Sequence, residues 1–244
     1  MKKIIELVLM LCFSVSLISI EKEVNNIIYI DPGHGGIDGG CEGIDGTKEK
    51  DLNLEISKYM HDRLDELGIE NTLLRDSDIT INPKDRVNKA IQPYGSGNDV
   101  LIISNHINAG GGEGAEIIYA LRNDDTLATL ALDNIGKKGQ IKRQVYQRVL
   151  PEDPSKDYYY ILRETKNTEP LLIEYGFIDN KNDVRKLENN LEEYVEGVVE
   201  AIAQYTGYEY KPPVEDNFYI VKPGDTLYKI ASQYNLTVDE LKEI

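Results

Sequence analysis

The stretch IIYIDPGHGG, residues 27–36, decides how the chain folds. Its first four residues are apolar and are followed at once by an Asp-Pro-Gly turn, a pattern typical of a buried strand that runs into a loop. The loop stays rich in glycine as far as Gly46, which gives its backbone unusual conformational freedom. Two polar residues, Asp31 and His34, therefore lie just beyond the expected strand.

Strand and helix patterns alternate along the chain outward from this stretch. From Glu49, apolar residues recur at helical spacing until Gly68 ends the pattern. The same criteria predict further strands at residues 70–74, 100–104, 115–119 and 171–175, and further helices at residues 83–91, 126–137 and 191–206. Residues 138–157 mix charged residues with two prolines, which favours a loop or a rim. The alternation predicts an α/β fold: one twisted, mostly parallel sheet with helices on both faces.

Composition limits the classes of partner. The chain has 244 residues, enough for one substantial domain and a small second unit, and a net charge of −16. Nucleic-acid binding requires clustered Lys and Arg, and no such cluster stands out in the sequence, so we expect no nucleic-acid partner. The two cysteines, Cys12 and Cys41, lie in an apolar leader and in the glycine-rich loop, and we expect no disulfide between them.

Residues 1–20 have the features of an export signal. Lys2 and Lys3 precede an uncharged apolar run, residues 7–20, which is shorter than the ~20 residues that a membrane span needs. We therefore expect a secretory signal. An apolar helix of the folded protein and an uncleaved membrane anchor are the alternatives, because no clean Ala-x-Ala cleavage site is present.

The rest of the chain is predicted to form a main domain at residues 27–206, a linker at 207–217 and a smaller unit at 218–244. The linker contains two adjacent prolines and acidic residues. The smaller unit has a short strand pattern at residues 219–221 and helical patterns at residues 226–234 and 238–244. Thr226 and Thr237 are expected to cap these helices, because a Thr side chain there accepts a hydrogen bond from the first helical turn.

Two of the three histidines, His34 and His106, directly follow predicted buried strands. In α/β sheets, ligands collect in the crevice beyond the carboxyl ends of the strands, so both imidazoles can meet there. Glu49 begins the first helix and can point its carboxylate into the same crevice. Two His and one carboxylate are a typical ligand set of catalytic zinc. Each residue alone also has an ordinary explanation, as a polar loop residue or as an acid favoured at a helix N-terminus, so position alone leaves both interpretations open.

Glu174 interrupts the apolar strand pattern at residues 171–175. A carboxylate among such residues is costly to bury unless it is paired or functional. Burial raises the pKa of a carboxyl group towards the range of a general base, so Glu174 is a candidate to take a proton from an attacking water. A cap or an ion pair near the sheet edge is the alternative. We expect His61 to be a solvated surface residue and Cys41 not to bind metal.

Four motifs, in this order, resemble the zinc-dependent N-acetylmuramoyl-L-alanine amidases of bacterial cell walls. The motifs are Ile30-Asp31-Pro32-Gly33-His34-Gly35-Gly36, Glu49-Lys50-Asp51-Leu52-Asn53-Leu54, Ser104-Asn105-His106-Ile107-Asn108-Ala109 and Ile173-Glu174-Tyr175-Gly176-Phe177-Ile178. The resemblance covers nearly all of residues 27–206. It implies that His34, Glu49 and His106 hold zinc and that Glu174 is the catalytic carboxylate.

The resemblance also implies the substrate, which is peptidoglycan cut at the amide between N-acetylmuramic acid and the first L-alanine of the stem peptide. Some members of the family carry a helix that blocks the site; no long insertion is evident in this sequence, so we expect an open site. Asn105 departs from the aliphatic residue expected before the third-motif His, which concerns local packing. A zinc peptidase that cuts within the stem peptide, and an inactive peptidoglycan-binding protein that keeps the fold, are the alternatives.

The start of the smaller unit, Tyr219-Ile220-Val221-Lys222-Pro223-Gly224-Asp225-Thr226-Leu227, resembles a LysM module, which binds glycans that contain N-acetylglucosamine. Such modules end with a second strand, whereas this sequence ends within the second predicted helix, so we expect a partial βαα module that binds weakly. We further expect a monomer that is secreted or associated with the cell wall. Its expected partner is peptidoglycan, with membrane contact only if the N-terminal segment stays uncleaved.

Overall fold

The computed structural model describes residues 26–92, 95–213, 219, 221, 225–234 and 236–243. The predicted export signal at residues 1–20 lies outside the described residues. Within them, no helix combines the length and the apolar character that crossing a membrane requires. The described residues divide into two compact units, one that ends at Tyr210 and one that begins at Lys211. The predicted linker at residues 207–217 lies partly outside the described residues, so its bounds stay a prediction.

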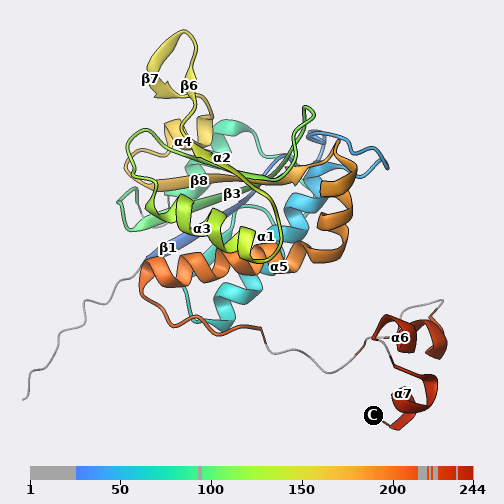
Figure 1. The fold of residues 1–244 in the computed structure, drawn as a ribbon. Coiled ribbons are helices and arrows are strands. Elements are labelled where there is room, and N and C mark those ends of the chain that lie inside the picture. Colours follow the sequence, from blue (N-terminus) through green and yellow to red (C-terminus); the bar gives the residue numbers. More distant parts are fainter. Residues whose placement is uncertain are drawn as a thin grey trace, which may run out of the picture. The chain divides into compact units, whose positions relative to one another are not determined.

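The larger unit is built on a six-stranded sheet with the strand order β2-β1-β3-β8-β4-β5 (Figure 1). The strands are β1 (Ile27–Pro32), β2 (Asn71–Leu73), β3 (Val100–Asn108), β4 (Ala115–Tyr119), β5 (Lys142–Tyr146) and β8 (Glu169–Phe177). All neighbouring strands are parallel except β4 and β8, which are antiparallel. The prediction of a mostly parallel sheet is confirmed. The strands β1, β3 and β8 are buried on both faces, which explains their continuous apolar runs.

Helices cover both faces of the sheet, as predicted. The long helices α1 (Glu49–Glu66), α3 (Thr126–Lys137) and α5 (Lys181–Thr206) pack on one face, and the short helices α2 (Pro83–Ile91) and α4 (Tyr160–Glu164) pack on the other (Figure 1). Successive side chains of β1 point to opposite faces of the sheet. Ile28 and Ile30 therefore belong to the core under the long helices, and Tyr29 belongs to the core under the short ones. The face under α2 and α4 is the one that carries the pocket described below.

Residues 138–157, predicted to be a loop or a rim, contain three strands. β5 forms an edge of the sheet, and β6 (Val149–Leu150) pairs with β7 (Asp153–Asp157) in a separate two-stranded sheet. The loop prediction was wrong because the sequence of β5, Lys-Arg-Gln-Val-Tyr, begins with three exposed polar residues and shows no buried pattern. Its pairing with β4 defines this strand, and such pairing leaves no periodic signal in the sequence.

Two central strands are longer than their apolar runs. The strand predicted at residues 100–104 continues to Asn108, so His106 lies inside β3 and not after it. The strand predicted at residues 171–175 likewise extends in both directions as β8. Backbone pairing between these two strands continues at polar positions. A prediction based on apolar residues ends before those positions.

Helix α5 begins at Lys181, well before the predicted start at Leu191, and its backbone departs from helical geometry at Asn190, where φ is −136°. The side chain of Asn180 caps the helix by accepting hydrogen bonds from two backbone N–H groups of the first turn. The turns before the bend are largely polar, which explains why helical spacing of apolar residues did not reveal them.

The smaller unit contains α6 (Leu227–Gln233) and α7 (Val238–Glu243). Both predicted caps are confirmed: Thr226 Oγ1 accepts a hydrogen bond from the Lys229 N–H at 3.3 Å, and Thr237 Oγ1 accepts one from the Glu240 N–H at 3.2 Å. The Glu240 carboxylate accepts in return from the Thr237 N–H at 2.7 Å, which completes a capping box. The predicted strand at residues 219–221 lies partly outside the described residues.

Candidate metal centre and active site

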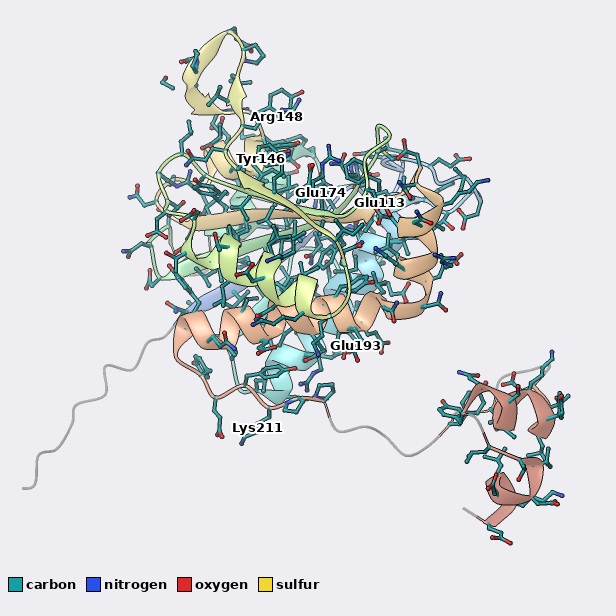
Figure 2. All side chains as sticks on the ribbon, in the orientation of Figure 1. Glu113, Tyr146, Arg148, Glu174, Glu193 and Lys211 are labelled. Carbon is teal, nitrogen blue, oxygen red and sulfur yellow. The ribbon has the colours of Figure 1, made fainter. Side chains whose placement is uncertain are left out.

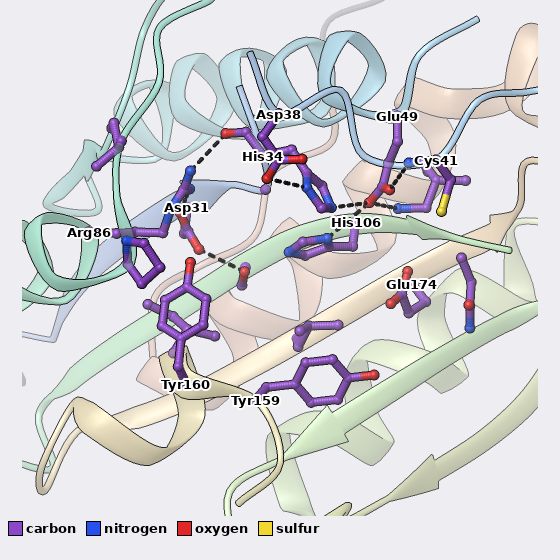
Figure 3. Close-up of a pocket in the computed structure, with 18 residues that line it drawn as sticks. Asp31, His34, Asp38, Cys41, Glu49, Arg86, His106, Tyr159, Tyr160 and Glu174 are labelled. Carbon is purple, nitrogen blue, oxygen red and sulfur yellow. Dashed lines mark hydrogen bonds and ion pairs between the residues drawn. The ribbon is translucent and has the colours of Figure 1, made fainter. Parts of the chain in front are cut away.

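A cavity of about 340 Å³ opens at the carboxyl ends of β1, β3 and β8, the position where α/β sheets bind ligands (Figure 3). His34, Glu49, His106 and Glu174 all line this pocket. His34 follows β1, His106 lies near the end of β3, Glu174 lies near the end of β8, and Glu49 begins α1. The fold therefore brings the four site residues predicted from the sequence into one pocket.

His34, Glu49 and His106 form a group whose ligand atoms all lie within 4.8 Å of one another. Glu49 Oε1 lies 3.2 Å from His34 Nε2 and 2.9 Å from His106 Nδ1. Two ligands of a tetrahedral zinc ion, each ~2.1 Å from the metal, lie ~3.4 Å apart. Both the spacing and the set of two imidazole nitrogens and one carboxylate oxygen therefore fit a zinc ion.

Donors from the loop and from α1 hold the carboxylate of Glu49 in place. The residue is 3% exposed. Its Oε2 accepts a hydrogen bond from the backbone N–H of Cys41 at 2.9 Å, and its Oε1 accepts one from the side chain of Asn53 at 3.2 Å. The glycine-rich loop and the first turn of α1 thus meet at one carboxylate. Cys41 contributes its backbone N–H to this arrangement.

The loop conformation fixes the ring of His34. This residue has a left-handed backbone, with φ of 59°, which is uncommon for a residue with a side chain. Its Nδ1 lies 2.9 Å from a carboxylate oxygen of Asp38, which leaves Nε2 directed at Glu49. A carboxylate on the second nitrogen of a histidine ligand orients the ring and makes it a better ligand.

Replacing Gly33 by Ala (G33A) is expected to disrupt the candidate metal-binding group, which we define as His34, Glu49 and His106, while the domain stays folded. A Cβ at Gly33 would lie 2.3 Å from the ring of His106, so the ring would have to leave its present position beside Glu49. Gly39→Ala is the matched control, because a Cβ there meets nothing closer than 4.0 Å. We expect the affinity for zinc, measured by competition with a chelating dye, to fall at least about tenfold in G33A only. Equal affinity in both variants would contradict this role of Gly33.

The charges around the metal-binding group favour a cation. Burial acts to lower the pKa of His34, but its contacts with Glu49 and Asp38 outweigh burial and raise this pKa to about 9. Burial acts to raise the pKa of Glu49, yet the contacts with His106 and His34 hold it well below its usual range. His34 therefore keeps its proton at neutral pH, and a metal ion would have to displace this proton in order to bind there.

Glu174 lies next to this group. It is the partner of His106 in the register of β3 and β8, and it is 8% exposed. Within the described residues, its Oε2 is buried and has no hydrogen-bond partner. Burial raises the pKa of Glu174 to about 7, with the charge of His106 opposing this shift and that of Glu49 adding to it. A buried carboxyl group with such a pKa, in a pocket, has the properties of a proton carrier.

The raised pKa of Glu174 predicts that the free energy of unfolding of the metal-free protein depends on pH. The folded state binds this proton more tightly than the unfolded chain, so the free energy of unfolding falls as the pH rises from about 4.5 to about 7. Glu174→Gln removes the titration. In urea unfolding with a chelator present, we expect the variant to be more stable than the wild type by up to about 3 kcal/mol at pH 8 and similarly stable at pH 4.5. The same difference at both pH values would refute this assignment.

The pocket wall contains a buried ion pair that sequence reasoning missed. Arg86 of α2 contacts the carboxylate of Asp31 and donates hydrogen bonds to the backbone carbonyls of Pro32 and His34, both at 2.7 Å. The hydroxyl of Ser104 donates to the same carboxylate at 2.8 Å. These contacts hold the loop that carries His34 against α2. In the sequence, Asp31 stood out as a turn residue and as part of the first motif, but no local signal connected it to Arg86.

Two other polar residues differ from the expectation in their surroundings. His61, predicted to be a solvated surface residue, is partly buried and contacts the side-chain oxygen of Asn71 at 2.6 Å. Asn105, which stands where an aliphatic residue was expected, is buried; it donates to Ser57 Oγ at 2.9 Å and accepts from the Tyr175 hydroxyl at 3.1 Å. These two partners explain how the core accommodates an amide at this position.

The chain is similar to proteins of known family. Residues 28–204 match the family described as N-acetylmuramoyl-L-alanine amidase, and residues 219–244 match the LysM domain. The chain is 33% identical over 179 residues to the uncharacterised protein YqiI of Bacillus subtilis, an alignment that covers 72% of this chain and 80% of that protein.

Two named amidases are also similar. The sporulation-specific N-acetylmuramoyl-L-alanine amidase of Bacillus subtilis is 34% identical over 168 residues, covering 67% of this chain and 60% of that protein, which is less than two thirds of its length. The solved structure of the N-acetylmuramoyl-L-alanine amidase AmiC2 of Nostoc punctiforme superimposes with a TM-score of 0.64 at 25% identity, covering 75% of this chain and 98% of that one. The chain belongs to the N-acetylmuramoyl-L-alanine amidase family.

Proposed function

We propose that the chain is a zinc-dependent hydrolase that cuts the amide between N-acetylmuramic acid and L-alanine in peptidoglycan. The observation that carries this proposal is the convergence of three potential metal ligands beside a buried carboxyl group in one pocket. The family match over residues 28–204 supports the choice of substrate.

In this proposal, His34, Glu49 and His106 hold the zinc ion. A zinc ion held there would supply Lewis-acid chemistry, which polarises a carbonyl group and lowers the pKa of a water molecule to ~7. The protein supplies the geometry: Asp38 orients the ring of His34, and the loop and α1 fix Glu49.

Glu174 carries the proton. Its buried Oε2, which has no hydrogen-bond partner among the described residues, accepts a proton from the water that attacks the lactyl carbonyl. Its pKa of about 7 allows it to give this proton back to the leaving nitrogen of L-alanine. One residue therefore serves as base in the attack and as acid when the C–N bond breaks.

The other parts of the chain fit a protein that acts on the cell wall. We propose that residues 1–20 direct export, that residues 27–206 form the catalytic domain, and that residues 207–217 link it to a glycan-binding LysM module at residues 218–244. The match of residues 219–244 to the LysM domain supports the last assignment and an association with the cell wall.

Analysis of digestion products tests the proposed function. Purified peptidoglycan is incubated with the zinc-loaded protein, and the released fragments are identified by mass spectrometry. We expect intact stem peptides with a free N-terminal L-alanine and glycans with a free lactyl carboxylate. Fragments that keep L-alanine on muramic acid would identify a peptidase instead. No cleavage despite bound zinc would identify an inactive binding protein.

A further inference from the structure

A row of polar residues crosses the sheet from the metal-binding group towards its edge. His106 on β3 pairs in register with Glu174 on β8, Glu174 pairs with Glu116 on β4, and Glu116 pairs with Gln144 on β5. Residues paired in this way point to the same face of a sheet and lie close together. Figure 2 shows Glu174 and Tyr146 on the side of the sheet opposite α3 and α5. A strip of polar residues therefore leads from the wall of the pocket, at His106 and Glu174, towards β5.

Glu116 is a fixed anion in this strip. It is 4% exposed. Its carboxylate accepts hydrogen bonds from the side chains of Asn108 at 3.2 Å, Gln144 at 3.1 Å and Tyr146 at 3.4 Å, and it forms an ion pair with Arg143. Asn108 also lines the catalytic pocket. One buried carboxylate thus connects the pocket to Arg143.

A bulge directs Arg143 towards the strip. The register between β4 and β5 shifts, because Ala115 pairs with Lys142 whereas the next residue, Glu116, pairs with Gln144. Arg143 is the extra residue, and strict alternation would place it on the face opposite Gln144. Bulges are frequent beside active sites, where they redirect a side chain. The bulge here lets Arg143 and Gln144 reach the same carboxylate.

The guanidinium of Arg143 contacts the protein through Nε, while part of the side chain is exposed to solvent. Its Nε contacts Glu116, and its central carbon lies 5.2 Å from the centre of the Phe177 ring. The side chain is nevertheless 45% exposed. A planar guanidinium fixed in this way keeps donors available for a carboxylate. Arg86, the one Lys or Arg among the described residues that line the pocket, is buried against Asp31.

We propose that Arg143 binds a carboxylate on the peptide part of the substrate and that Glu116 positions it for this role. This inference rests on the proposed function. Muramic acid uses its carboxyl group in the scissile amide, so the carboxylates that remain in a muramoyl peptide belong to the peptide. Acidic residues line the pocket, so a cation at its margin would favour the binding of a peptide that carries free carboxylates.

The test compares an N-acetylmuramoyl peptide that has free carboxylates with the same compound in which they are amidated. We expect R143Q to raise KM for the acidic substrate about 10- to 100-fold, with kcat little changed, and to leave the amidated substrate unaffected. R143K should recover part of the lost affinity for the acidic substrate. Lysine restores the positive charge but lacks the planar guanidinium that can donate two hydrogen bonds to one carboxylate. The matched control is K142Q, which removes the same charge one residue earlier on β5, where Lys142 pairs with Asp133 on the surface.

Binding of the two compounds, measured by calorimetry, separates this inference from the proposed function. If the wild type hydrolyses neither compound, the proposed function fails, and weaker binding of the acidic compound to R143Q still supports the anion site. If R143Q and the wild type bind and cleave both compounds alike, the anion site is refuted while the amidase activity stands. An equal loss on both compounds would assign Arg143 a structural role and also overturn the proposal.

Discussion

Replacing Glu174 by Gln (E174Q) is expected to lower kcat for muramoyl peptides about 10²- to 10⁴-fold while zinc stays bound. Gln has nearly the same shape, but its amide oxygen does not take a proton from water at neutral pH. Glu174 lines the pocket and lies outside the metal-binding group of His34, Glu49 and His106, so the ligand set is unchanged. Turnover is followed as the release of peptides with an N-terminal alanine, and zinc content is followed by elemental analysis.

The matched control for this variant is Glu193→Gln. Glu193 lies on α5, which covers the opposite face of the sheet, and its carboxylate contacts Lys138 at the surface (Figure 2). Surface pairs of this kind contribute little, so this variant should keep the wild-type rate. Hydrolysis by E174Q at the wild-type rate would rule out Glu174 as the proton carrier. Loss of zinc from E174Q would instead indicate a structural effect on the ligands.

Replacing His106 by Ala (H106A) is expected to weaken zinc binding strongly and to lower activity together with it. This change removes one of the three ligands and leaves Glu49 without its 2.9 Å contact to an imidazole nitrogen. Because even the loss of a residue that only supports a ligand costs 10- to 100-fold in metal affinity, we expect a decrease of more than about 100-fold. Titration of the metal-free protein with zinc, followed by calorimetry, measures the affinity directly.

The chain offers a matched control in its third histidine. His61 contacts Asn71 on the neighbouring strand and lies outside the metal-binding group, so H61A should keep one zinc ion per chain at unchanged affinity. Retention of zinc by H106A, with the affinity of H61A, would contradict the proposed ligand set. A third possible result, in which both variants lose zinc, would point to general destabilisation and would also count against a specific role of His106.

The metal-binding group was predictable because each of its members stands next to a strong local signal. His34 and His106 follow or end apolar runs, and Glu49 begins a clear helical pattern after a glycine-rich loop. The rule that ligands gather at the carboxyl ends of parallel strands then brings these residues together without any knowledge of contacts. Glu174 was visible for a related reason, since it is the one carboxylate in the apolar strand pattern at residues 171–175.

The features that were not predictable depend on pairing between distant segments. Asp31 and Arg86 form a buried ion pair, but each lies in a local pattern that has an ordinary explanation. Arg143 reaches Glu116 only because of a shift in strand register, and register at an exposed edge strand is set by backbone pairing. The bounds of β3 and α5 were missed for a similar reason, because pairing and capping extend these elements through polar residues.

The contact between Arg86 and the loop after β1 restricts which substitutions this part of the fold tolerates. One guanidinium serves the Asp31 carboxylate and two backbone carbonyls, a task for which the single ammonium group of Lys is poorly suited. A change at position 31 or 86 alone would leave a buried charge without its partner, whereas Lys84 on the exposed side of α2 takes no part in this contact. A transplant of β1 and its histidine loop into another protein must carry α2 with it, since an isolated buried carboxylate would cost about 3–5 kcal/mol.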